Sequence, residues 1–76
     1  MKIIVVVLMF QEVIQDVQAF IGDDARAKAH KQFEKWTKVD YMDFAIRKEA
    51  GESSEDILGE DFAGTELYGI TANEVQ

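Results

Sequence analysis

The sequence predicts a small α+β domain whose elements run β-β-α-α-β, with a three-stranded sheet in the order 2-1-3 and two helices packed on one face. An apolar run covers residues 3–10, helical periodicity follows over 25–37 and 41–50, and a segment rich in strand-forming residues covers 65–71. The chain has 76 residues and no proline, repeat or long linker, so we expect one domain spanning residues 1–76.

The first predicted strand runs from Ile3 to Phe10. Odd-numbered side chains point to one face and even-numbered side chains to the other, and both sets are apolar. A strand of this kind belongs in the middle of a sheet. A secretory signal or a membrane segment is disfavoured because Gln11 and Glu12 end the run after eight residues, and about 20 are needed to span a bilayer.

A hairpin is predicted next, although its turn, Gln11-Glu12, lacks the Gly or Asn that primed turns favour. The second strand is expected from Val13 to Phe20. Regular alternation puts on one face Val13, Gln15, Val17 and Ala19, and on the other Ile14, Asp16, Gln18 and Phe20. Mixed faces of this kind are typical of an edge strand.

The first helix is predicted over residues 25–37, after the breaker Gly22 and the candidate N-caps Asp23 and Asp24. One side of this helix is apolar and consists of Ala25, Ala29, Phe33 and Trp36. The opposite side carries Lys28, Lys31, Lys35 and Lys38. We expect Trp36 to be largely buried against the sheet.

The second helix is predicted from Tyr41 to about Ala50, with Asp40 as its cap and Gly51 as its end. In the acidic, loop-rich segment that follows, Ser53-x-x-Asp56 resembles a capping box and predicts one short helical turn. The last strand is expected over 65–71, and residues 72–76 are expected to be a frayed tail. A right-handed crossover through the helix pair would place the last strand parallel to the first.

Two helices on one face leave the other face of the central strand uncovered. The exposed set would begin at either Ile3 or Ile4, and burying each large apolar side chain contributes roughly 1.5–3 kcal/mol. The sequence therefore predicts a homodimer formed through this face, with helices divided between both faces as the alternative.

Catalytic motifs are absent, and we expect a protein that is not an enzyme. His30 is the only histidine and lies at the margin of the apolar side of its helix. The glycine patterns of phosphate and dinucleotide sites, the H-E-x-x-H motif and the spacing of a calcium loop do not occur. We therefore expect no metal and no cofactor. Zero cysteines exclude disulfides and a thiolate site, and they favour a cytoplasmic location.

Charge is unevenly distributed along a chain whose net charge is −7. Residues 25–39 carry five basic residues and one acid, whereas 40–76 carry ten acids and two basic residues. Clustered carboxylates can imitate backbone phosphates and steer association with a basic protein. The predicted partner-binding residues are Asp40, Asp43, Glu49, Glu52, Glu55, Asp56, Glu60 and Asp61.

The sequence thus favours a small acidic protein-binding module that docks on a basic partner, including a nucleic-acid-binding complex. In size, acidity and lack of catalytic groups it resembles small phage-encoded inhibitors of host defence, such as anti-CRISPR and anti-restriction proteins. This resemblance implies an inhibitor and assigns a role to no residue. The alternatives are solvated charged faces without a partner, a homo-oligomeric structural or assembly protein, and a nucleic-acid binder using the Lys28–Lys38 helix face, which a net charge of −7 disfavours.

Overall fold

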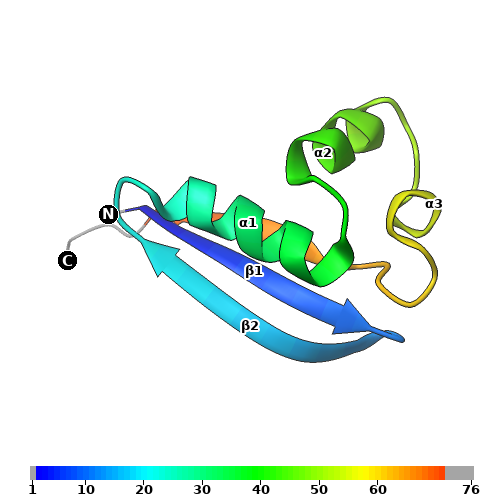
Figure 1. Cartoon of the computed structure of the whole chain (residues 1–76), viewed down its shortest axis with the longest axis horizontal. Helices are drawn as coiled ribbons and strands as arrows, with labels where there is room; N and C mark the ends of the chain where they lie inside the picture. The colour runs from blue at the N-terminus through cyan, green and yellow to red at the C-terminus, as the bar shows by residue number, and fades with distance from the viewer. Residues whose placement is uncertain (1, 72–76) are drawn as a thin grey trace.

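The sheet is built around its first strand, as Figure 1 shows. The computed structural model describes residues 2–71. Its elements are β1 (Lys2–Phe10), β2 (Val13–Ile21), α1 (Ala25–Thr37), α2 (Tyr41–Glu49), α3 (Ser54–Leu58) and β3 (Glu66–Thr71). The strand order is β2-β1-β3, and α1 lies along one face of the sheet while α2 packs on α1 and α3. The predicted α+β class and the 2-1-3 order are confirmed.

The direction of β3 differs from the sequence-based expectation, because β3 runs antiparallel to β1. α1 carries the chain along the sheet to the end where the β1–β2 turn lies (Figure 1). α2, nine residues and therefore about 13 Å long, packs on α1 and α3 and does not run back along the sheet. β3 consequently starts at the turn end, with Glu66 opposite Val7. The buried Thr65 hydroxyl fixes this start, since it accepts from the Met9 N–H and donates to the Met9 carbonyl.

The helices cover the face of β1 that carries Ile4 and Val6, which are 1% and 0% exposed. Side chains from all three helices complete this core, namely Ala25, Ala29, Phe33, Phe44, Ile57 and Leu58. Trp36, which was expected to be largely buried against the sheet, is partly buried and packs at the margin of the core. Phe33 takes the central position instead, with its ring centroid 5.0 Å from that of Phe44.

A bulge in β2 changes which side chains share a face. Leu8 pairs with Asp16 but Met9 pairs with Ile14, which leaves Gln15 as the extra residue. Ile14 therefore lies on the uncovered face with Val17, whereas regular alternation had assigned these two residues to opposite faces. The sequence could not reveal this, because a bulge depends on the pairing between two strands.

The helix starts follow their predicted caps in two of three cases. The Asp43 N–H donates to the Asp40 carboxylate at 3.3 Å, and the Asp56 N–H donates to the Ser53 hydroxyl at 3.1 Å. Asp24 precedes α1 but makes no side-chain cap bond, and its carboxylate lies 3.2 Å from Lys28 Nζ. The predicted frayed tail lies outside the described residues.

Candidate protein-binding surfaces

The eight predicted partner-binding acids lie on α2, on α3 and in the segments beside them. Seven are exposed and Glu52 is partly buried. Figure 1 shows α2 above the C-terminal part of α1 and α3 beyond it, at the turn end of the sheet. The chain thus gathers acids that are spread over about 20 positions of the sequence into one region of the fold.

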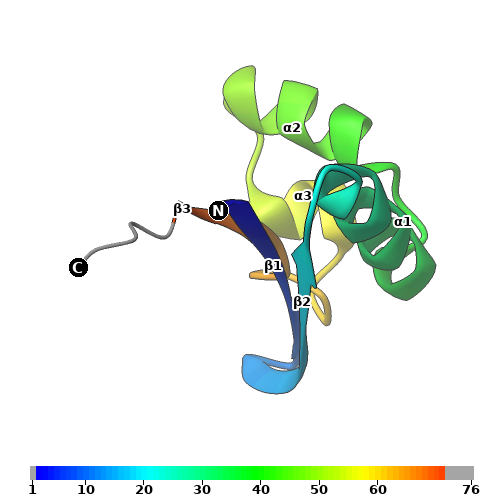
Figure 2. The same ribbon diagram turned by 90° about the vertical axis from the view of Figure 1, so that its left-hand side faces the viewer.

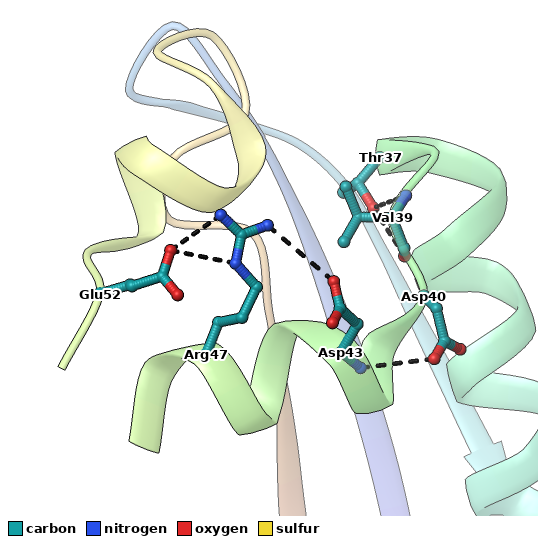
Figure 3. Close-up of polar contacts among 6 residues, drawn as sticks. All are labelled: Thr37, Val39, Asp40, Asp43, Arg47 and Glu52. Carbon is teal, nitrogen blue, oxygen red and sulfur yellow. Dashed lines mark hydrogen bonds and ion pairs between the residues drawn. The ribbon is translucent and has the colours of Figure 1, made fainter. Parts of the chain in front are cut away.

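Arg47 of α2 neutralises part of this region (Figure 3). Its Nη2 and Nε donate to Glu52 Oε1 at 2.8 and 3.0 Å, and its Nη1 lies 3.9 Å from Asp43 Oδ2. The hydrogen bond from Arg47 lowers the pKa of Glu52, and the same bond raises the pKa of Arg47. Glu52 therefore ties the segment before α3 to α2, a structural role that its sequence position did not indicate.

Four of the predicted acids remain without a side-chain hydrogen bond or ion pair within residues 2–71. These unpaired acids are Glu49, Glu55, Asp56 and Glu60. All four are exposed, so their charge is available to a partner. Asp40 is engaged as the cap of α2, and Asp61 lies close to the Gln11 amide at a side-chain distance of 3.5 Å.

The β1–β2 turn adds an acid that sequence reasoning did not include. The Gln11 N–H donates to the Asp61 carbonyl at 2.8 Å, which brings the turn against the acidic loop. Glu12 follows Gln11 in the turn and is exposed, so this backbone bond also brings its charge near the acidic loop. The contact joins positions 50 residues apart, and no local pattern could have signalled it.

α2 also exposes two large apolar side chains, Met42 at 54% and Ile46 at 64%. They are one helical turn apart and so share a side of α2. Ala45, Ile46 and Glu49 line a shallow depression of about 200 Å³. Both lie on the side of α2 opposite Phe44, the buried residue of this helix, and therefore face solvent.

The lysine side of α1 is exposed as predicted. Lys28 pairs with Asp24, and Lys38 Nζ donates to the Lys35 carbonyl at 3.2 Å. Exposed pairs of this kind contribute little to stability. The stripe is therefore a solvated basic surface on the side of α1 opposite the core residues.

His30 packs on Tyr41 with a centroid separation of 4.8 Å. Burial lowers the pKa of His30, the nearby charge of Arg26 lowers it further, and Asp40 opposes both. Its Nε2 is buried without a hydrogen-bond partner in the described part of the chain. Within residues 2–71 no nucleophile or carboxylate is bonded to His30, and its lowered pKa favours the neutral imidazole.

Residues 2–71 contain no group of three side chains able to hold a metal ion, and none of the described helices has the length and apolarity that crossing a bilayer requires. In comparisons with known proteins, no family model, curated protein or solved structure matches this chain.

Proposed function

We propose that this protein is a non-enzymatic binding module that docks on a basic protein through α2, α3 and the loop between α3 and β3. As an inhibitor, it covers the nucleic-acid-binding surface of its partner with carboxylates that occupy the positions of phosphates. Charge complementarity of this kind speeds encounter and selects the partner.

One observation carries this proposal: α2 exposes Met42 and Ile46 among acids that have no partner within residues 2–71. Binding energy in interfaces is concentrated in a few apolar or aromatic anchors, and polar groups at the rim contribute orientation and rate. A charged surface without anchors would attract basic proteins weakly and without selection. Here Ile46 and Glu49 line the same depression, so an anchor and a rim charge are adjacent.

The test compares two double variants that change the net charge equally. Glu49→Gln with Glu55→Gln removes two unpaired acids, and Asp23→Asn with Glu34→Gln removes two exposed acids elsewhere. Partners retained from a lysate of the source cell are identified by mass spectrometry, and the affinity of the purified partner is then measured for each variant. We expect the first variant to lose at least tenfold in affinity and the second to bind like the unmodified protein.

A further variant, Ile46→Ala, tests the anchor. Because Ile46 is mostly exposed, the substitution should leave the midpoint of unfolding nearly unchanged. It should lower the affinity for the partner several-fold. A competing oligonucleotide should displace the protein from its partner. The proposal is wrong if charge reversal at Lys28, Lys31 and Lys35 abolishes binding while the acid variants bind normally, since the basic side of α1 would then be the functional surface.

A further inference from the structure

The face of the sheet opposite the helices is apolar across all three strands. The register puts Ile3, Val5 and Val7 of β1 on this face, between their partners on β2 and β3. Five large side chains of the two outer strands are 48–60% exposed there: Ile14, Val17, Ile21, Tyr68 and Ile70. Figure 2 shows the sheet with its helices on the other side. We call the face formed by these side chains of β1, β2 and β3 the open face.

The open face is almost free of charge. Glu66 is the one acid or base that the register assigns to it within the described strands. Its carboxylate accepts from the Tyr41 hydroxyl at 3.2 Å and from the Leu67 N–H at 2.9 Å, so it is engaged with α2 and with the backbone. A protein of net charge −7 thus has one broad neutral surface, and its charged groups lie elsewhere.

The size of the open face matches a small protein interface. From Ile3 to Met9 the strand rises about 20 Å, and three strands cover about 14 Å in width. Because a surface of protruding side chains has more accessible area than its outline, covering two such faces removes on the order of 1,000 Å² from water, close to the lower limit of specific interfaces. Each face contributes about 500 Å², which is at the upper end of the apolar patches that monomeric proteins leave uncovered, and patches of this size are often functional.

We propose that the open face binds a second copy of this chain, giving a face-to-face homodimer with the helices on the two outer sides. An uncharged apolar face can pair with the same face of a second copy about a two-fold axis, and two twisted sheets pack about 10 Å apart in this arrangement. A charged partner would find no complementary group on the face. An anionic bilayer would be repelled by the net charge, and within residues 2–71 no basic rim surrounds the strands to offset that repulsion.

This proposal does not depend on the proposed function, because it uses the side of the molecule opposite the helices. The two surfaces can therefore be tested separately in one set of proteins. Each copy of a dimer retains its own α2, and the dimer presents two acidic docking surfaces.

The decisive experiment compares Val17→Asp with Val13→Asp. The two valines lie on the same strand and are 50% and 57% exposed, but Val17 pairs with Val7 on the open face and Val13 pairs with Phe10 on the covered face. Both substitutions add one negative charge. Sedimentation equilibrium is recorded from micromolar to several hundred micromolar, with circular dichroism to establish that each variant is folded.

We expect the unmodified protein and Val13→Asp to reach about 17 kDa, twice the chain mass of 8.6 kDa, with a micromolar dissociation constant. Val17→Asp should stay monomeric over the same range. If Val17→Asp fails to fold, Val17→Thr takes its place in the test. This substitution keeps the branched side chain and the strand propensity, and it should weaken the dimer several-fold. The proposal is overturned if the unmodified protein has a mass of 8.6 kDa at every concentration. It is also overturned if the dimers of Val17→Asp and Val13→Asp dissociate to the same extent.

Discussion

Tyr41 connects three elements of the fold through a single side chain. Its ring packs on His30 and Phe33 of α1 and lies 5.6 Å from Phe44, and its hydroxyl donates to Glu66 at the start of β3. Burial raises the pKa of Tyr41 to about 12, and the charge and hydrogen bond of Glu66 act in the same direction. The residue that begins α2 therefore also holds β3 in place.

The raised pKa makes folding stability depend on pH in the alkaline range. In the unfolded chain Tyr41 ionises near its ordinary value of 10.0, whereas in the folded protein it stays protonated up to about pH 12. Its contribution to stability is thus present below pH 10 and lost as the pH rises to about 12. An absorbance titration of Tyr68→Phe, in which Tyr41 is the one remaining tyrosine, should show a midpoint near 12. Between pH 10 and 12 the Tyr41→Phe variant should lose less of its free energy of unfolding than the unmodified protein loses. An absorbance midpoint near pH 10 in Tyr68→Phe would contradict the raised pKa of Tyr41.

Among the elements, the hairpin turn is the one whose sequence fits its conformation least. Gln11 and Glu12 adopt φ angles of 52° and 68°, the left-handed geometry of a primed turn that favours Asn and Gly. The double substitution Gln11→Asn with Glu12→Gly should therefore raise the free energy of unfolding by about 1 kcal/mol. Urea denaturation with an unchanged slope would report this gain. Glu12→Ala, which removes the charge but keeps the Cβ, should give no comparable increase, and an equal increase would assign the effect to charge.

The elements that could be predicted from the sequence are those whose signal is local. The doubly apolar run of β1, the periodicity of α1 and the caps Asp40 and Ser53 each act within a few residues, and the structure has them at the expected positions. The direction of β3 could not be predicted, because it depends on how α2 packs on α1 and α3. The faces of β2 were likewise set by a bulge that arises only in pairing with β1.

The same distinction applies to the candidate binding surface. Acidic positions can be found by inspection of the sequence, but which acids are neutralised follows from contacts. Glu52 bonds to Arg47, whereas Glu49 and Glu55 have no such partner within residues 2–71. The exposure of Ile46 also depends on which side of α2 is buried, because Phe44 faces the core and Ile46, two residues later, lies on the opposite side of the helix.

At the scale of the whole molecule, charge and apolar surface are separated. The helices and their loops carry the unpaired acids and the lysine stripe, and the open face of the sheet carries neither. The two proposed interactions consequently rest on different forces. Docking on a basic protein is an attraction between opposite charges, which salt weakens, whereas dimerisation brings together two copies of net charge −7 through a neutral surface.

The response of the dimer to salt follows from this separation. At about 0.01 M salt the screening length is near 30 Å, so the two acidic copies repel across the whole domain, whose longest extent is 40 Å. At about 0.15 M the length is near 8 Å, and most of that repulsion is removed. The dimer dissociation constant should therefore fall several-fold as sodium chloride rises over this range, measured by sedimentation at fixed pH. Val13→Asp should show a somewhat steeper fall, because each copy carries one more negative charge. A dissociation constant that rises with salt would instead indicate ion pairing between the basic side of α1 and the acids of a second copy, an arrangement in which the open face has no part.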